Sequence, residues 1–184
     1  MSTPATSAAD KRKTQPDFVP LRIAVLTVSD TRDEATDTSG ALLRDLLLRD
    51  GHLCADRRIV RDDRYLIRAV VSQWIADDDV QVVITTGGTG FTGRDITPDA
   101  LLPLFDKPIE GFGELFRQIS FTEIGTSTVQ SRALGGIANG TLVFALPGSG
   151  GACRTGWEKI LKDQLDIRHR PCNFAELMPR FRER

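Results

Sequence analysis

The residues most able to do chemistry stand together in one glycine-rich stretch, residues 85–100, with the sequence TTGGTGFTGRDITPDA. It follows an apolar run typical of a buried strand and leads into a Thr-Pro pair typical of a helix start. A strand, a glycine-rich loop and a helix N-terminus in series form a natural binding site for phosphate or another anion. Because the loop also carries Arg94, Asp95 and Asp99, it predicts chemistry on a phosphorylated ligand. The competing interpretation of its glycines alone is a tight turn.

Two aspartates, Asp62 and Asp95, are candidate ligands for a magnesium ion. Nucleotidyl and phosphoryl transfer usually needs Mg²⁺ held by one or two carboxylates together with the substrate phosphates. A structural role is open for each aspartate. Asp95 can cap a turn and pair with Arg94, while either Asp62 or Asp63 can be the N-cap of the helix that follows. The residues alone favour the capping role for Asp62.

Four arginines are candidates for contacts with phosphate, because a guanidinium can donate two hydrogen bonds to phosphate oxygens. These residues are Arg94, Arg117, Arg132 and Arg154. A solvated surface position is the simpler interpretation of each one taken singly. Arg154 is placed early in a predicted helix, where a cation is mildly unfavourable and a bound anion would explain it.

The cysteine content and the charge balance argue against several other functions. The three cysteines form no CxxC pair, which favours a reducing compartment such as the cytoplasm. Cys153 has no histidine or second cysteine near it in the sequence, so thiol catalysis and Cys/His metal ligation are both rejected. The net charge of -1 argues against general nucleic-acid binding. No apolar run approaches the ~20 residues of a membrane-spanning helix.

The apolar pattern predicts the elements that must position these side chains. Runs rich in β-branched residues predict strands at residues 22–28, 53–60 and 80–85, and apolar residues at helical spacing predict helices between them. This alternation is typical of a parallel α/β sheet. Residues 1–17 predict a disordered N-terminal tail, which leaves residues 18–184 as a single domain.

The second half of the chain contains a hairpin and another glycine-rich turn. Asn139-Gly140 predicts the hairpin, and Pro147-Gly148-Ser149-Gly150-Gly151 follows the second of its strands and opens a helix. Residues 111–132 read as mostly helical with a break near Gly125. Thr97 is the predicted N-cap of the helix after the first glycine-rich loop.

The polar connections are expected to meet at one edge of the sheet. In an open parallel sheet, the loops at the carboxyl ends of the strands surround the ligand. Both glycine-rich loops, residues 29–31 and Asp62-Asp63 would then line one crevice, provided that the strand order brings them together.

With these motifs assembled, the chain closely resembles the MoaB/MogA family of molybdenum-cofactor biosynthesis proteins. The resemblance extends from about Leu21 to Arg180, and the ending Arg170-Pro171-Cys172-Asn173-Phe174 looks like the MoaB branch. The order and spacing of five motifs carry it: Ser29-Asp30-Thr31-Arg32, residues 85–100, Gly111-Phe112-Gly113-Glu114, residues 128–132 and Leu146-Pro147-Gly148-Ser149.

The resemblance implies a three-layer α/β/α fold with a mainly parallel sheet, assembled as a homotrimer or homohexamer. The ligand would be molybdopterin, a pterin with a phosphate and a dithiolene. In the MogA branch, the terminal phosphate of molybdopterin attacks the α-phosphorus of Mg-ATP and pyrophosphate leaves. A partner protein later inserts molybdate into the adenylyl-molybdopterin product.

The same resemblance assigns the site residues. It gives catalytic roles to Asp62 and Asp95, which reverses the capping interpretation of Asp62, and it makes Asp95 the magnesium ligand. The implied pocket for the pterin and the nucleotide comprises Ser29, Asp30, Gly87, Gly88, Thr89, Gly90, Arg94, Asp99, Glu114, Pro147, Gly148 and Ser149.

Three alternatives stay open at this point. A non-catalytic protein of the same family would hold molybdopterin or its precursor and pass it on. A scaffolding role, known for this domain type within larger proteins, is disfavoured because no added domain or long linker is present. A nucleotide-hydrolysing CinA-like domain usually has the loop TTGGLGPT followed by two acidic residues, whereas here Thr89 follows Gly88 and Arg94 precedes Asp95.

Overall fold

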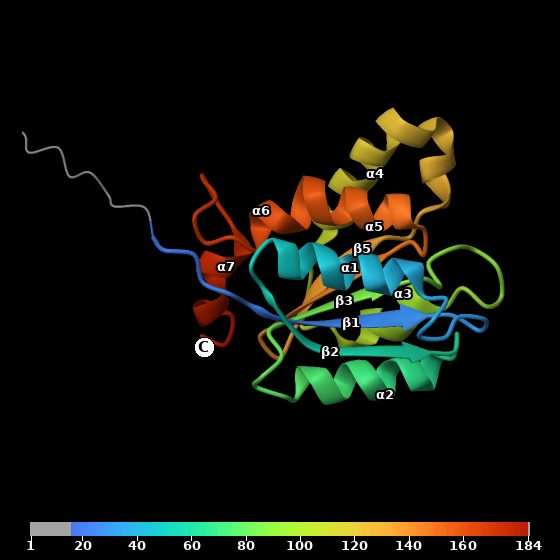
Figure 1. The fold of residues 1–184 in the computed structure, drawn as a ribbon, viewed down its shortest axis with the longest axis horizontal. Helices are drawn as coiled ribbons and strands as arrows, with labels where there is room; N and C mark the ends of the chain where they lie inside the picture. The colour runs from blue at the N-terminus through green and yellow to red at the C-terminus, as the bar shows by residue number, and fades with distance from the viewer. Residues whose placement is uncertain (1–15, 184) are drawn as a thin grey trace, which may run out of the picture.

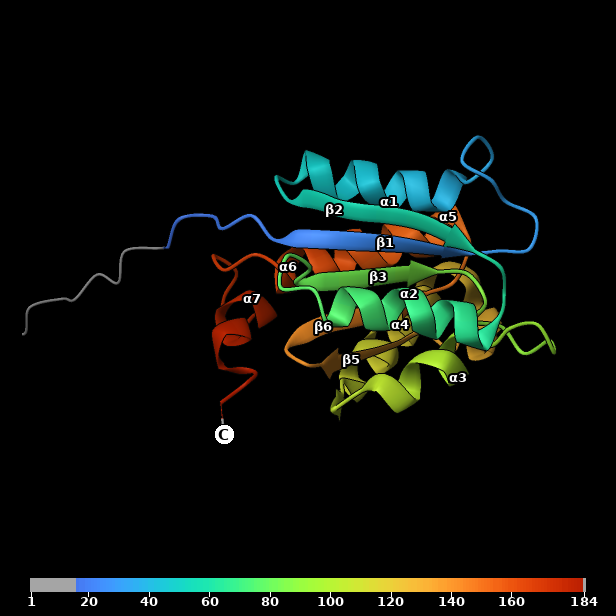
Figure 2. The ribbon, with the colours of Figure 1, turned by 90° about the horizontal axis from the view of Figure 1, so that it is seen from below.

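The computed structural model describes residues 16–183, which form a twisted six-stranded sheet with helices on both faces (Figures 1 and 2). The strand order is β2-β1-β3-β6-β5-β4. The predicted disordered tail, residues 1–17, falls almost entirely on residues 1–15, which lie outside the described part of the chain. The three-layer α/β/α fold with a mainly parallel sheet is therefore confirmed.

Four strands run parallel: β2 (Leu53–Val60), β1 (Arg22–Val28), β3 (Val82–Thr86) and β6 (Thr141–Leu146). Every residue of β3 and β6 is buried, as the continuous apolar runs predict. β5 (Leu134–Ala138) pairs antiparallel with β6, and the two-residue β4 (Lys107–Pro108) pairs antiparallel with β5. The carboxyl ends of the parallel strands thus share one edge, on the right in Figure 1.

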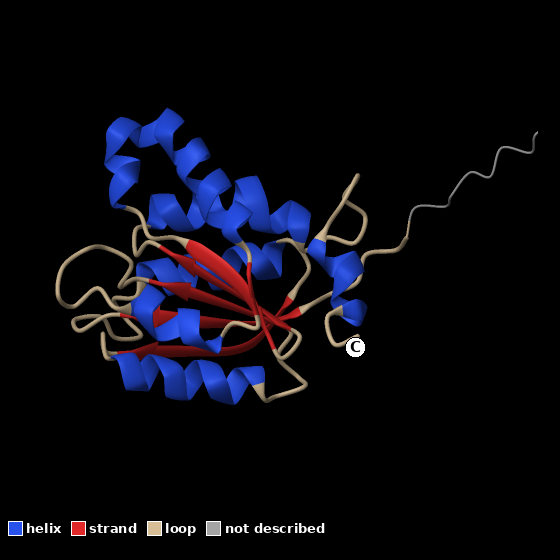
Figure 3. Cartoon of the chain, turned by 180° about the vertical axis from the view of Figure 1, so that it is seen from behind, coloured by secondary structure: helices blue, strands red, loops and turns tan. Residues whose placement is uncertain are grey.

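The alternation of side chains along the strands builds a separate core on each face. One core packs under α1 (Thr38–Arg49), α4 (Glu110–Ile124) and α5 (Gly150–Gly156), and it contains Trp157. The other packs under α2 (Arg64–Ile75) and α3 (Thr97–Leu101), and it contains Trp74. Figure 3 shows α4 and the segment after it projecting beyond the sheet.

The remaining helical segments are short. They are the 3-10 turns Leu102–Leu104, Gly125–Gln130 and Met178–Arg180, the π-helical turn Trp157–Leu161, α6 (Lys162–Gln164) and α7 (Phe174–Leu177). The break predicted near Gly125 is where α4 gives way to a 3-10 turn. None of the helices between residues 16 and 183 has the length and apolar character needed to cross a bilayer.

Three of the longer helical starts follow cap residues that the sequence offers. Asp37 caps α1, Asp63 caps α2 and Ser149 caps α5, each through a side-chain oxygen that accepts a backbone N–H. The prediction that Thr97 caps α3 is wrong, because Thr97 is already the first helical residue. Its hydroxyl donates instead to the carbonyl of Gly87 at 2.9 Å. The Thr97 side chain thus bonds to the glycine-rich loop and not to the first turn of its own helix.

The predicted hairpin at Asn139-Gly140 is present between β5 and β6. Both residues have positive φ, 48° and 83°, as a type I′ turn requires. The loop that joins β3 to α3 and the turn that joins β6 to α5 leave neighbouring strands of the sheet. The strand order therefore brings the two glycine-rich loops to one crevice. The prediction that residues 29–31 and Asp62-Asp63 line the same crevice is wrong, because these connections lie outside its lining.

Candidate functional site

The two glycine-rich loops both line a cavity of about 530 Å³ at the carboxyl edge of the sheet. A cavity of this size can hold a small organic ligand. Eight of the residues predicted for the site line it: Gly87, Gly88, Thr89, Gly90, Asp95, Pro147, Gly148 and Ser149.

Glycine is required where the first loop leaves β3. Gly87 has φ of +101°, and a Cβ atom there would lie 2.2 Å from the carbonyl oxygen of Val28. Gly88 has φ of +61°, and a Cβ atom there would lie 3.0 Å from both carboxylate oxygens of Asp62. At Gly90 a Cβ atom would lie 2.8 Å from Oδ2 of Asp95. Both aspartates therefore lie directly against the backbone of the loop, which only glycine allows to approach so closely.

Asp95 is held by its own loop. Its Oδ2 accepts hydrogen bonds from the Thr92 hydroxyl at 2.6 Å and from the Thr92 backbone N–H at 2.8 Å. These bonds keep the pKa of Asp95 below its usual value, although burial opposes them. The turn-capping role that competed for this residue is thus real, and it leaves the carboxylate ionised at the cavity wall.

Asp62 has the opposite environment. Asp63 caps α2, so Asp62 is released from that role, and its only side-chain hydrogen bond among residues 16–183 comes from the Ile96 N–H at 3.4 Å. Burial raises the pKa of Asp62, and the neighbouring charges of Asp95 and Asp30 raise it further. A half-buried carboxylate with spare acceptor capacity beside two others is a candidate partner for a cation.

Ser29 and Asp30 line an adjacent recess of about 570 Å³ instead of the main cavity. Asp30 accepts two hydrogen bonds from Arg94, at 2.5 and 2.9 Å, and one from the Asp62 N–H at 3.2 Å. The hydrogen bond from Arg94 holds the pKa of Asp30 below its ordinary value. Arg94, predicted to bind cofactor, is thus engaged in an exposed ion pair that bridges two loops.

The other candidate arginines also bond to the protein, and none of the described cavity-lining residues is Arg or Lys. Arg117 donates to the Ala133 carbonyl at 3.2 Å. Arg154 pairs with Glu158 at 3.4 Å. Arg132 pairs with Asp99 at 2.9 Å and also bonds to the first glycine-rich loop.

The remaining predictions, Asp99 on α3 and Glu114 on α4, are exposed and do not line the cavity. Sequence reasoning missed the wall that α4 and the following 3-10 turn supply instead. Thr155 of α5 donates to Glu123 of α4 at 2.9 Å and closes this wall. The helical spacing of Phe116, Ser120 and Glu123 was the available signal. The missed lining residues are Phe116, Ser120, Glu123, Ile124, Ser127, Thr128, Gln130, Ser131, Gly151, Ala152 and Thr155.

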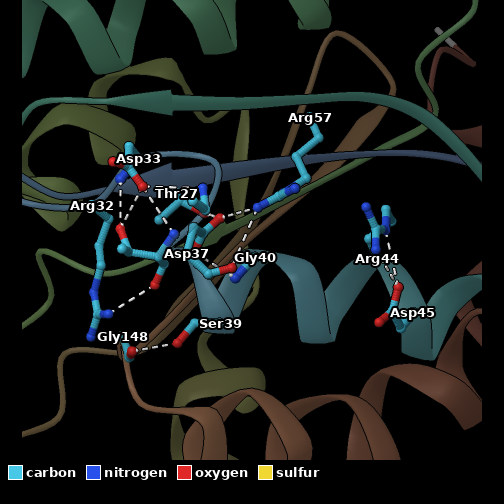
Figure 4. Close-up of polar contacts among 12 residues, drawn as sticks. Thr27, Arg32, Asp33, Asp37, Ser39, Gly40, Arg44, Asp45, Arg57 and Gly148 are labelled. Atoms are coloured by element: carbon cyan, nitrogen blue, oxygen red, sulfur yellow. Dashed lines mark hydrogen bonds and ion pairs between the residues drawn. The ribbon is translucent and has the colours of Figure 1, made fainter.

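The second glycine-rich turn is anchored from α1. The Ser39 hydroxyl donates to the Gly148 carbonyl at 2.7 Å, as Figure 4 shows. Asp37, two residues earlier at the N-cap of α1, is buried and pairs with Arg57 at 2.6 Å, while the Thr27 hydroxyl donates to it at 2.8 Å (Figure 4). Burial tends to raise the pKa of Asp37, but these bonds outweigh it and lower the pKa. A buried ion pair therefore fixes the start of α1 and, through it, the turn.

Cys153 lies in an environment that disfavours thiol chemistry. It is fully buried, and burial raises the pKa of its thiol to about 11. The rejection of thiol catalysis agrees with this environment.

Comparison with known proteins identifies the domain. Residues 24–167 match the family model described as "Probable molybdopterin binding domain". The chain is 63% identical over 158 residues to molybdenum cofactor biosynthesis protein B of Escherichia coli K12, covering 86% of this chain and 93% of the relative.

Solved structures agree. A crystal structure of a molybdenum cofactor biosynthesis protein B has a TM-score of 0.78 and 47% identity, covering 80% of this chain and 92% of the other. The tungsten cofactor synthesizing protein MoaB from Pyrococcus furiosus has a TM-score of 0.71 and 39% identity, covering 78% and 92%. The chain therefore belongs to the MoaB/MogA family of molybdopterin-binding domains and falls in its MoaB branch.

Proposed function

We propose that the protein acts in molybdenum-cofactor biosynthesis, where it binds molybdopterin and adenylylates it with Mg-ATP. In this reaction a terminal phosphate oxygen of molybdopterin bonds to the α-phosphorus of ATP, and the bond from that phosphorus to pyrophosphate breaks. Family membership supports the binding of molybdopterin. One observation carries the catalytic part: two carboxylates, Asp62 and Asp95, lie against the glycine-rich loop of a ligand-sized cavity. Asp95 lines the cavity itself, and Asp62 lies behind the loop at Gly88.

The glycine-rich loop suits the phosphate end of the ligand. The backbone of Gly87, Gly88 and Gly90 lines the cavity, and loops of this kind commonly bind anions through backbone N–H groups. The apolar part of the cavity wall, with Phe116 and Ile124, suits the flat pterin. The second turn and α5 close the cavity on the other side.

The carboxylates fit a magnesium ion that arrives with the nucleotide. Residues 16–183 contain no group of three or more acidic, histidine or cysteine side chains arranged to hold a metal. Mg²⁺ commonly binds through one or two carboxylates plus substrate phosphates, so Asp95, assisted by Asp62, meets its needs. When bound, Mg²⁺ supplies positive charge that offsets the repulsion between two phosphate groups.

The direct test combines the full chain with molybdopterin, ATP and Mg²⁺ and follows pyrophosphate and adenylyl-molybdopterin. We expect product from the wild type and a loss of roughly 100-fold or more in Asp95→Asn, with molybdopterin binding retained. Asp79→Asn is the matched control, because Asp79 is 89% exposed beside Arg22 at the start of β1. Equal product from Asp95→Asn and Asp79→Asn would remove Asp95 from the reaction.

The second candidate is a carrier that binds molybdopterin or its precursor without turnover. The absence of Arg and Lys from the described cavity lining favours it, since phosphoryl-group transfer usually uses cationic side chains. Tight molybdopterin binding without ATP-dependent pyrophosphate release from the wild type would select the carrier.

We further propose that the chain works in the cytoplasm as a homotrimer or homohexamer and hands its product to a molybdate-inserting protein. Exposed apolar side chains on α4 and the 3-10 turn after it support self-association: Leu115, Phe121, Ile124 and Val129. Size-exclusion chromatography with light scattering measures the assembly, and a monomer at micromolar concentration would contradict it.

A further inference from the structure

We propose that Arg132 is a positioning residue that clamps the first glycine-rich loop and so sets the place of Asp95 in the site. The consequence for Mg²⁺ and nucleotide rests on the proposed adenylyl transfer, whereas the clamp itself is a property of the free protein. Arg132 lies just before β5, some forty residues beyond the loop it holds.

The guanidinium of Arg132 reaches three points of the loop and of the helix after it. Nε donates to the Gly90 carbonyl at 2.8 Å, and one terminal nitrogen donates to the Asp95 carbonyl. The other terminal nitrogen pairs with Oδ2 of Asp99 at 2.9 Å. The loop is therefore fastened on both sides of residues 91–94.

Two further contacts support the clamp, and the second uses the guanidinium itself. The backbone N–H of Arg132 donates to the Thr89 carbonyl at 3.2 Å, which fixes the base of the side chain against the same loop. The guanidinium carbon lies 5.3 Å from the centre of the Phe91 ring, which is itself 70% exposed. A planar fork can serve divergent acceptors and stack on a ring together, whereas the compact ammonium of lysine cannot.

The clamp also joins the two walls of the cavity. Ser131, the residue before Arg132, lines the cavity at the end of the segment that follows α4, and Asp95 lines it from the loop. Because Arg132 bonds to the carbonyl of Asp95, a shift of either wall is passed to the other through one side chain. Arg132 lines no part of the cavity itself, so this role acts through Asp95 and not on the ligand.

The test uses the full chain with Arg132→Gln, Arg132→Lys and, as a control, Arg180→Gln. Arg180 is a 68% exposed arginine that pairs with Glu183 near the C-terminus. The first measurement is amide hydrogen exchange of residues 88–99 in the free protein. We expect exchange there to rise about tenfold in both Arg132 variants, with β1 and β6 unchanged.

The second measurement is the Mg²⁺ concentration that gives half-maximal adenylyl-molybdopterin formation. We expect it to rise about 10-fold in both Arg132 variants, the range typical for residues that orient a metal ligand, with a smaller change in KM for molybdopterin. Asp99→Asn keeps both carbonyl contacts and is expected to give a smaller rise in both measurements. The control is expected to match the wild type.

Three results would overturn the clamp. The first is unchanged amide exchange of the loop in both Arg132 variants, and the second is an equal rise in exchange throughout the protein. The third is wild-type behaviour of Arg132→Lys, which would show that only the positive charge matters. If the wild type forms no product, the adenylyl-transfer proposal fails, but the loop exchange still decides whether Arg132 holds the loop.

Discussion

The two glycine-rich loops leave neighbouring strands and face the same cavity, yet they are held by different forces. The turn after β6 is held by neutral hydroxyls from buried residues: Thr86 donates to the Pro147 carbonyl at 3.1 Å and Ser39 to the Gly148 carbonyl at 2.7 Å. The loop after β3 has one neutral support of this kind, the Thr97 hydroxyl on the Gly87 carbonyl at 2.9 Å, and its longer-range supports are charged groups. These are Arg132 on its carbonyls and on Asp99, and the exposed pair of Arg94 with Asp30.

We therefore regard the turn after β6 as a fixed wall of the cavity and the loop after β3 as a wall that responds to ions and ligands. Buried neutral hydrogen bonds are little affected by salt or pH, whereas exposed charged contacts are screened by ions and compete with charged ligands. The loop after β3 also carries Asp95 and lies against Asp62, while the turn after β6 carries no charged side chain. We therefore expect substitutions that weaken the turn after β6 to lower the free energy of unfolding. Substitutions in the loop after β3 should instead change the response of the protein to its ligand.

Gly87→Ala should have the largest effect on stability, because Gly87 lies where the two glycine-rich loops meet. A methyl group there would meet the Val28 carbonyl at 2.2 Å, and the backbone has φ of +101°. We expect the free energy of unfolding in urea to fall by about 3 kcal/mol. Gly151→Ala is the control: nothing lies within 4 Å and helix propensity favours alanine, so no loss is expected. Equal losses would show that the close approach at Gly87 is unimportant.

Ser39→Ala tests the neutral support of the turn after β6. It removes the hydroxyl that donates to Gly148, and we expect a loss of about 1 kcal/mol in the free energy of unfolding. The loss should be the same at low and high salt, since neither partner is charged. Ser72→Ala, at an exposed position on α2, should be close to neutral. A salt-dependent loss at Ser39 would contradict the distinction between the two loops.

Asp62→Asn tests the charged surroundings of the loop after β3. Because burial and neighbouring carboxylates raise the folded-state pKa of Asp62, its ionised form destabilises the free protein. We expect the amide to raise the free energy of unfolding at pH 7, by less than about 1 kcal/mol after solvent screening, while product formation falls.

The sign of its pH dependence follows from the same raised pKa. The gain in the free energy of unfolding should be full at pH values above the folded-state pKa of Asp62. It should vanish as the pH falls below the unfolded-state pKa of about 3.9, where Asp62 is protonated in both states. Urea unfolding at several pH values measures it. A loss of stability in Asp62→Asn at pH 7 would contradict the assigned environment.

Arg94→Gln should have the smallest effect on stability. Its side chain is 66% exposed, so solvent screens the pair with Asp30 and the urea midpoint should barely change. Any change at low salt should disappear at high salt, which thermal unfolding at two ionic strengths can measure. A salt-independent loss would place Arg94 among the rigid supports, like Ser39.

Much of the fold was predictable because it rests on local patterns. The apolar runs that become β1 and β3 are buried from both faces, so their hydrophobicity is continuous and easy to recognise. Asn139-Gly140 needs positive φ at both positions, which few other residue pairs allow. β4 was missed because Lys107-Pro108 is too short to show alternation, and it exists only through pairing with β5.

The site was predictable only in part. The glycines of the first loop, the Pro147 turn and Asp95 could be assigned from their types and order, and they do line one cavity. Glu114 was misplaced, and the wall containing Ser120 and Glu123 was missed, because the face a helix turns toward a cavity depends on what packs against it.

By itself, the sequence determined the α/β class, the glycine-rich loops, the acidic residues beside them and the family. These depend on residue type and short spacing, which can be read directly from the sequence. Only the tertiary structure decided that Asp63 and not Asp62 caps α2, that Thr97 bonds to Gly87, and that Arg132 bonds to the loop. Each of these is a choice among several possible hydrogen-bond partners, and the chain makes that choice only when distant segments are brought within bonding distance.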